Sequence, residues 1–147
     1  MKKINFFFLS TALFFTSQAQ IAVTVTNETN TTPVLATSYT SFANALTALN
    51  ATTAMTGPIT LTLAAGNETA PPSGFTIGSA TLNLVLSATN TLTIINTGAA
   101  AILNAGVGTA TSLDAAPDGI LKIVGADYIT VDGLTFTDWN TTNPATM

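Results

Sequence analysis

The sequence predicts an all-β protein: a parallel β-helix (a solenoid) with a short N-terminal capping helix, with an antiparallel β-sandwich as the alternative. Threonine and isoleucine, which favour strands, recur in very short runs, and glycine, asparagine and aspartate, which favour turns, separate those runs. The hydrophobic fraction is 47% and the charged fraction 7%. Because disordered chains combine low hydrophobicity with high charge, we expect a folded domain.

Alternation of apolar and polar residues predicts the strands. Residues 21–26 place Ile21, Val23 and Val25 on one face, the pattern of a half-buried strand. The further predicted strands are residues 59–63, a strand marked by Leu82, Leu84 and Leu86, and residues 92–95, 101–103, 120–124, 128–131 and 134–136. The predicted loops are residues 27–33, 66–67, 71–74 and a long turn-rich excursion at 106–119.

Residues 40–50 change from a period of two to a helical period. Their apolar residues fall at i, i+3, i+4 and i+7, which is one stripe of an amphipathic helix. Thr40 or Ser41 is available as its N-cap. The stripe consists of Phe42, Ala45, Leu46 and Leu49.

Three features favour a coil over a sandwich. The strands are as short as the sides of a coil. Ile59, Leu82 and Ile102 are spaced by about one coil, in the range of roughly 20–45 residues that solenoid repeats use. The helix precedes the first regular strand, where it would cover the open end of a β-helix and block edge-to-edge association.

Residues 1–19 have the three-part layout of a secretory signal. A positive start with Lys2 and Lys3 is followed by an apolar run that is too short to span a membrane. Small residues, Ser17 and Ala19, stand where a signal peptidase reads, so we expect cleavage between Ala19 and Gln20. The predicted organisation is therefore a signal at 1–19, an N-terminal strand and linker at 20–38, and a β-helix domain at 39–147.

The charge balance excludes two classes of partner. The whole chain carries three Lys or Arg and seven Asp or Glu, for a net charge of −4. Once the signal is removed, Lys122 is the one remaining cation. Nucleic acids and anionic membrane surfaces both need a basic face, so neither is an expected partner, and no membrane insertion is expected after signal removal. The chain has no cysteine, so burial and backbone pairing must stabilise it without disulfides.

Several segments resemble one family of exported proteins. The stretch from Ser41 to Asn50, then residues 57–63, and above all residues 125–136 resemble the N-terminal part of large secreted bacterial surface proteins with a right-handed, pectate-lyase-like parallel β-helix. That group is typical of Bacteroidetes-type bacteria and is usually exported by type IX secretion. The resemblance covers residues 39–140, and it implies a right-handed coil. Because such proteins are much longer and end in a sorting domain, we expect the β-helix to be truncated at Met147.

Candidate catalytic groups are few. Asp127, Asp132 and Asp138 cluster in one stretch, but glycoside hydrolysis needs two carboxyl groups at a set separation, and turn roles explain the first two aspartates. Lyase chemistry needs a base and cations, for which only Lys122 is available. We therefore expect no catalysis here. Asp132, Asp138 and Trp139 are the candidates for contact with carbohydrate or another surface component.

No cofactor is expected. The chain has neither histidine nor cysteine, which removes the usual transition-metal ligands. A single Ca²⁺ near Asp114 or Asp118 is the remaining metal hypothesis, since Ca²⁺ binds oxygen ligands.

Paired threonines recur along the chain, among them Thr24 with Thr26 and Thr60 with Thr62. Such pairs are similar to the Thr-x-Thr rows of ice-binding β-helices, which work when they stack at a constant interval. The intervals here are irregular, so strand propensity is the expected explanation.

These observations predict an exported, structural or adhesin-like β-solenoid segment, secreted or held at the cell surface. The alternative is the N-terminal fragment of a polysaccharide-active β-helix enzyme, a lyase or glycosidase, whose active site lies downstream.

Overall fold

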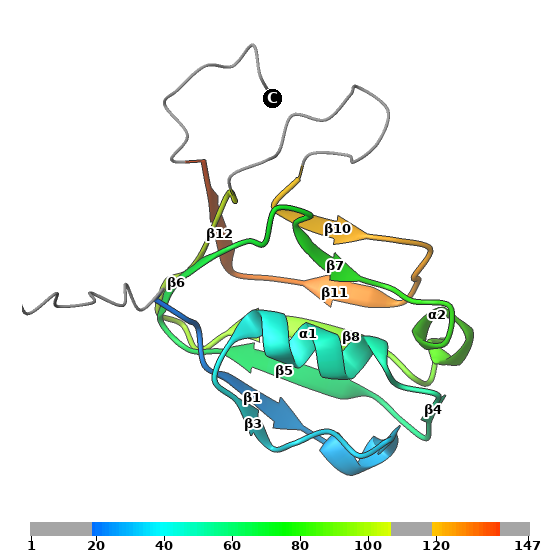
Figure 1. Cartoon of the computed structure of the whole chain (residues 1–147). Coiled ribbons are helices and arrows are strands. Elements are labelled where there is room, and N and C mark those ends of the chain that lie inside the picture. Colours follow the sequence, from blue (N-terminus) through cyan, green and yellow to red (C-terminus); the bar gives the residue numbers. More distant parts are fainter. Residues whose placement is uncertain (1–18, 107–118, 139–147) are drawn as a thin grey trace, which may run out of the picture.

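The computed structural model describes residues 19–106 and 119–138, and in these ranges the protein is all-β with two short α-helices and one 3-10 turn (Figure 1). The strands are β1 (Val23–Thr26), β2 (Thr31–Thr32), β3 (Ser38–Tyr39), β4 (Ala54–Met55), β5 (Ile59–Leu63), β6 (Gly66–Thr69), β7 (Phe75–Ile77), β8 (Leu92–Asn96), β9 (Ala101–Asn104), β10 (Leu121–Ile123), β11 (Ile129–Val131) and β12 (Leu134–Thr137). The helices are η1 (Glu28–Asn30), α1 (Phe42–Asn50) and α2 (Leu82–Val85).

Among β5 to β12, every pairing of one of these strands with another, within the described residues, is parallel. β5, β8 and β11 form one parallel ladder, β6, β9 and β12 a second, and β7 and β10 a third. The order β5, β6, β7 therefore visits the three ladders in turn, and β8, β9 and β10 visit them again. No hairpin joins these strands, which is unlike an antiparallel sandwich.

Antiparallel pairing is confined, in the described ranges, to the N-terminal strands. β1 pairs with β5 on one side and with β3 on the other, so the first sheet runs β11-β8-β5-β1-β3. β2 and β4 form a separate two-residue antiparallel pair. The N-terminal strands thus cover the free edge of β5, the first strand of its parallel ladder.

The core is the interior of the three ladders. β5 alternates buried and half-buried residues, with Ile59, Leu61 and Leu63 fully buried, as its sequence predicts. Their partners Leu92 and Ile94 in β8 are also fully buried. The predicted alternation in β1 is confirmed too: Val23 and Val25 face inward and the threonines outward.

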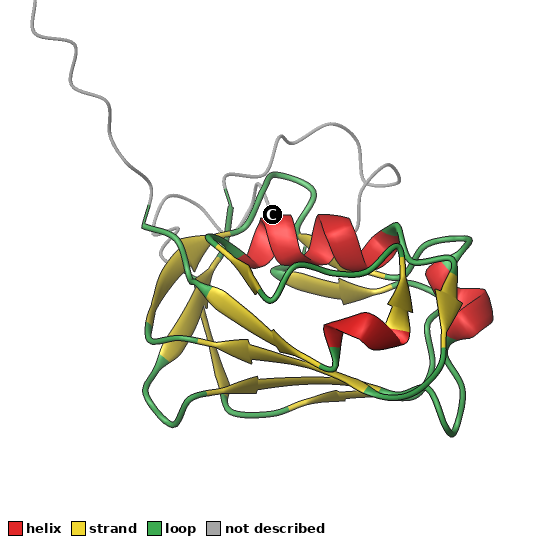
Figure 2. Cartoon of the chain, turned by 90° about the horizontal axis from the view of Figure 1, so that it is seen from below, coloured by secondary structure: helices red, strands yellow, loops and turns green. Residues whose placement is uncertain are grey.

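The predicted helix is confirmed as α1. The Ser41 side chain accepts a hydrogen bond from the Asn44 N–H at 3.1 Å, which caps the first turn. The buried residues of α1 are the predicted stripe, Phe42, Ala45, Leu46 and Leu49. Figures 1 and 2 place α1 across the core from the five-stranded sheet. There the Phe42 ring packs on that of Phe75 in β7, with centroids 5.1 Å apart.

The last residue of α1 continues the hydrogen bonding of β7. The Asn50 side-chain amide donates to the Thr76 carbonyl at 2.8 Å, and its Oδ1 accepts from the Gly78 N–H at 2.9 Å. The Asn50 side chain therefore pairs with the carbonyl of Thr76 in β7 and with the N–H of Gly78, which follows β7, as the backbone of a neighbouring strand would. Helix α1 takes the place of a strand below β7.

Replacing Asn50 with aspartate is expected to lower the free energy of unfolding by about 1–3 kcal/mol. The new carboxylate keeps the acceptor for Gly78 but places a second oxygen against the Thr76 carbonyl. Urea unfolding of wild type and variant measures the loss. The matched control is Asn67→Asp, which introduces the same charge at an exposed position of β6 and is expected to change stability by less than about 0.5 kcal/mol.

The strand predicted from Leu82, Leu84 and Leu86 is wrong, because that segment forms α2. The Ser79 carbonyl accepts from the Asn83 N–H, and the Leu82 carbonyl accepts from the Leu86 N–H, which are helical bonds. A strand would bury all three leucines equally, yet Leu82 is fully buried while Leu84 is 84% exposed. Local hydrogen bonding at Ser79 outweighs the period-two pattern.

Replacing Leu84 with serine is therefore expected to change stability by less than about 0.5 kcal/mol, because the side chain is already in water. Leu82→Ala, a truncation of a fully buried side chain in the same helix, is expected to cost about 2–5 kcal/mol. Thermal unfolding of the two variants compares them. Equal losses would support the strand interpretation instead.

The predicted coil spacing of Ile59, Leu82 and Ile102 is wrong in its residues. Ile59 pairs with Leu92, not Leu82, and Ile102 pairs with Asn67 in β6. The predicted turn at residues 66–67 is the start of β6, and β7 went unpredicted. The predicted loop at 27–33 holds η1 and β2.

The remaining predicted elements agree with the structure. β8, β9, β10, β11 and β12 occupy the segments that alternation predicts, and the loop at residues 71–74 is closed by a hydrogen bond from the Gly74 N–H to the Pro71 carbonyl. Most of the excursion at 106–119 lies outside the described residues.

Candidate functional site

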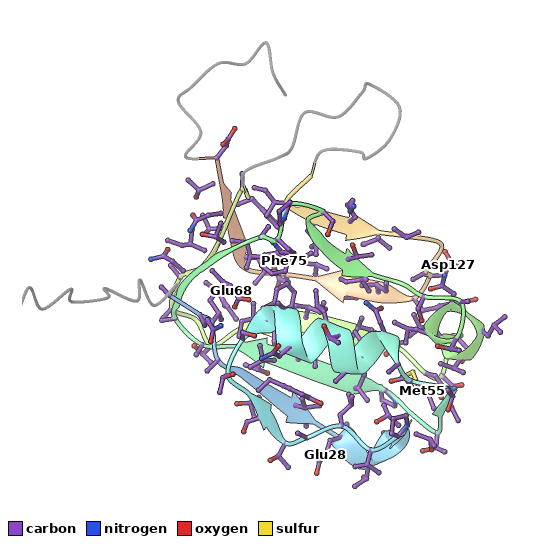
Figure 3. The ribbon with its side chains drawn as sticks, in the orientation of Figure 1. Glu28, Met55, Glu68, Phe75 and Asp127 are labelled. Atoms are coloured by element: carbon purple, nitrogen blue, oxygen red, sulfur yellow. The ribbon has the colours of Figure 1, made fainter. Side chains whose placement is uncertain are left out.

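A buried polar cluster surrounds Glu68, at the start of α1 (Figure 3). Glu68 lies in β6 and is only 5% exposed. Its Oε2 accepts hydrogen bonds from the N–H groups of Ile21 at 2.9 Å and Phe42 at 2.8 Å. Its Oε1 accepts from the Ala43 N–H at 3.0 Å. Three segments of the chain thus converge on one buried carboxylate.

The position of Glu68 suits a negative charge. Phe42 and Ala43 are the first residues of α1, whose N–H groups have no partner within the helix. The helix dipole places partial positive charge at the same end. Together with Ser41, which accepts from Asn44, the Glu68 carboxylate satisfies the free donors of the first turn. A buried charge is tolerated here because each carboxylate oxygen accepts at least one hydrogen bond.

Glu68 is not among the candidate site residues that the sequence indicates. Glu68 follows the predicted turn at 66–67, and an acidic residue next to a turn is expected to be exposed to solvent. The signal that points to it is its place in the alternation: in the observed strand, Glu68 pairs with the buried Leu103 of β9 and so faces the core.

A shallow hollow of about 350 Å³ opens beside this cluster. Glu68 is the single titratable side chain among its lining residues, so the hollow does not bring together the two carboxyl groups that glycoside hydrolysis needs. The other lining residues are Ala19, Gln20, Ser41, Ala43, Asn44, Thr69, Ala70 and Pro71.

The aspartates singled out in the sequence do not converge. Asp127 and Asp132 lie before and after β11, so they are at opposite ends of that strand, roughly 15 Å apart along the backbone. Both are exposed, and the Asp132 N–H donates to the Ile94 carbonyl at 2.9 Å. Asp138 follows β12 and is exposed, while Trp139 lies outside the described residues. Lys122 is half-buried in β10, in register with Thr76.

Within residues 19–106 and 119–138, no group of three or more acidic, histidine or cysteine side chains is placed to hold a metal ion. The Ca²⁺ hypothesis concerns Asp114 and Asp118, which lie outside those ranges. Among the described helices, none has the length and apolar character needed to cross a bilayer.

The structure brings some of the threonines into a row that their sequence intervals did not predict. Thr26 in β1 pairs with Thr60 in β5, Thr60 with Thr93 in β8, and Thr93 with Thr130 in β11. Because paired residues point to the same side of a sheet, the four threonines share the outward face of the five-stranded sheet. The loops between the strands differ in length, so unequal intervals in the sequence do not prevent these four threonines from forming a row.

The fold and site define the class as an all-β protein whose described part carries one buried carboxylate cluster. Comparison with known proteins narrows it no further: no family model, no curated protein and no solved structure matches the chain.

Proposed function

We propose that this protein is an exported, non-enzymatic, structural or adhesin-like segment built on a right-handed parallel β-helix of the pectate-lyase-like kind. The observation that carries the proposal is the register of the three parallel ladders. Ile59 pairs with Leu92 and Leu92 with Ile129, and both intervals fall within the roughly 20–45 residues of solenoid repeats. A right-handed coil follows from the strong preference of parallel crossover connections for that hand.

The last strands of two ladders, β12 and β10, support continuation of the solenoid into further coils. In β12, Leu134 and Phe136 pair with the buried Ala101 and Leu103 and so face the interior, yet Phe136 is 47% exposed. In β10, Ile123 pairs with the buried Ile77 and is 51% exposed. An apolar interior at the end of a stack is stabilised when another coil covers it.

A parallel, in-register stack can be tested with paired cysteines, because the natural chain has none. Thr60 and Thr93 are direct partners, so the double variant Thr60→Cys/Thr93→Cys is expected to form a disulfide on mild oxidation. Thr60 and Thr130 are two strands apart, about 9.6 Å, and their cysteine pair is the control expected to stay reduced. Mass spectrometry after digestion identifies the bonds, and the reverse result would reject the stack.

Export and cleavage are tested separately. Expression of the full chain in a Bacteroidetes-type host is expected to release a protein whose N-terminal sequence begins at Gln20. Recovery of an intact N-terminus in the cytoplasm would reject the secreted location. Replacing Ala19 with arginine, which a signal peptidase does not accept at that position, is the control that should retain the precursor.

The alternative is the N-terminal fragment of a polysaccharide-active lyase or glycosidase. It predicts that the whole enzyme cleaves a polysaccharide. An adhesin-like segment binds a carbohydrate or another surface component without cleaving it. Binding to a panel of immobilised polysaccharides, with product release followed by reducing-end assay, separates the two. Asp132→Ala and Asp138→Ala then test the two described contact candidates.

A second candidate function, binding to ice, is favoured by the row of Thr26, Thr60, Thr93 and Thr130 on one sheet face. Adjacent strands repeat hydroxyl and methyl groups at about 4.8 Å, which gives the face a regular spacing. Thermal hysteresis of the purified protein tests it, with Thr93→Lys as the variant that should abolish the effect. Freezing behaviour equal to that of an inert protein would reject this second function.

A further inference from the structure

The Glu68 carboxylate accepts a hydrogen bond from Ile21, and the residue before Ile21 is Gln20, whose nitrogen would become the amino terminus after signal removal. The Ile21 N–H donates to Glu68 Oε2 at 2.9 Å, and Ile21 is fully buried. The nitrogen of Gln20 is one residue earlier, a step of about 3.8 Å along the backbone. Both Gln20 and Glu68 line the same hollow.

The carboxylate also has capacity for another donor. Two oxygens offer about four acceptor positions, and three N–H groups occupy three of them, two on Oε2 and one on Oε1. Lys122, the one cationic side chain in the described residues, lies in β10, in register with Thr76 and not among the residues of the hollow. No cationic side chain therefore lines the hollow, and a group that pairs its positive charge with Glu68 there must be of another kind.

We propose that Glu68 binds the α-ammonium group of Gln20 once cleavage after Ala19 has created it. In the precursor the same nitrogen is a neutral amide, whereas in the mature protein it is a cation beside a mostly buried anion. The mature protein is therefore more stable than the precursor, and the fold is completed by its own processing. This inference rests on the proposed export and cleavage.

The test compares three forms of the folded domain, made directly without the signal: one beginning at Gln20, one beginning at Ala19, and one beginning at an acetylated Gln20. Each is prepared with and without Glu68→Gln. Intact mass verifies a free amine in the first form, because cyclisation of an N-terminal glutamine releases ammonia and removes the charge. Near pH 6.5, the free Gln20 form is expected to melt on the order of 5 °C above the other two. With Glu68→Gln, that gap should close.

Melting temperatures measured over a range of pH add a second test. If Glu68 only capped α1, the difference between the free and acetylated forms would not depend on the pH. An α-amino group has an unperturbed pKa of about 7.7–8.0, and binding to a carboxylate raises the pKa in the folded state. The added stability is therefore fully present below about pH 7.7 and is lost as the pH rises through the raised folded-state pKa. Glu68 is the titratable side chain of the hollow that faces this group. The gap between free and acetylated forms should shrink toward pH 10.

Equal melting temperatures of the three Glu68-containing forms at every pH would overturn the proposal. If the Glu68→Gln variants do not fold, the pH series on the free and acetylated forms decides the question alone. Since these proteins are made without a signal, their result is independent of export. A failure to be secreted in the host experiment would reject the proposed location and leave the measured pairing unaffected.

Discussion

Replacing Glu68 with alanine is expected to lower the free energy of unfolding by about 3–5 kcal/mol, the largest effect of any polar substitution in the described residues. The change leaves the N–H groups of Ile21, Phe42 and Ala43 without their acceptor. Each buried donor left unpaired costs about 1–3 kcal/mol, and water entering from the adjacent hollow offsets part of that cost. Urea unfolding followed by circular dichroism measures the loss.

The matched control is Glu28→Ala, which makes the same chemical change in η1. Glu28 is half-buried in a short 3-10 turn, and its replacement is expected to cost less than about 1 kcal/mol. Glu68→Gln should fall between Glu68→Ala and wild type, because the amide oxygen retains one acceptor while the amide nitrogen faces a backbone donor. Similar losses for Glu28→Ala and Glu68→Ala would show that net charge matters and the hydrogen bonds do not.

Replacing Phe75 with alanine is expected to cost about 3–5 kcal/mol. Phe75 is 2% exposed and packs on Phe42, with ring centroids 5.1 Å apart and planes inclined by 56°. This contact joins β7 to α1, so the loss also weakens the attachment of the helix. Thermal and urea unfolding of Phe75→Ala, Phe42→Ala and the double variant give the coupling energy of the rings, expected to be about 0.5–1.5 kcal/mol.

Phe136→Ala is the control for this series, since it removes the same ring from a position that is 47% exposed in β12. We expect a loss well below that of Phe75→Ala, because less apolar surface returns to water on unfolding. A comparable loss would mean that Phe136 is covered in solution, by a second copy or by another part of the chain.

The Glu68 cluster connects the fold to the proposed export. The Glu68 carboxylate accepts hydrogen bonds from the N-terminal segment at Ile21 and from the start of α1, and so joins both to strand β6. Cleavage after Ala19 would accompany the proposed export. The proposed pairing of Glu68 with the Gln20 amino group would add stability at that stage.

The sequence by itself determined the secondary structure wherever one local pattern dominates. Helix α1 was predicted with its buried stripe, because side chains spaced three and four residues apart share a helix face whatever the rest of the chain does, while its cap was narrowed to Thr40 or Ser41. β5 and β1 were predicted for the analogous reason in strands. The all-β class follows from these same patterns.

Local pattern misled where hydrogen bonds override it. The leucines at 82, 84 and 86 alternate like a strand, yet Ser79 bonds the first turn of a helix and α2 forms. Gly66 and Asn67 have turn composition, yet they lie in β6 because β9 supplies a paired edge. Ser79 is three residues from Leu82, so its effect lies within the local sequence, whereas β9 is distant in the sequence and no local window around residues 66–67 contains it.

Only the tertiary structure decided which strands pair and which side chains meet. Ile59 could have been matched with Leu82 on spacing alone, and the row of Thr26, Thr60, Thr93 and Thr130 is invisible at irregular intervals. The cluster at Glu68 likewise joins residues 21, 42, 43 and 68. Parallel pairing depends on loop lengths and on contacts between distant segments, so register is fixed by global packing of the core and not by any single strand.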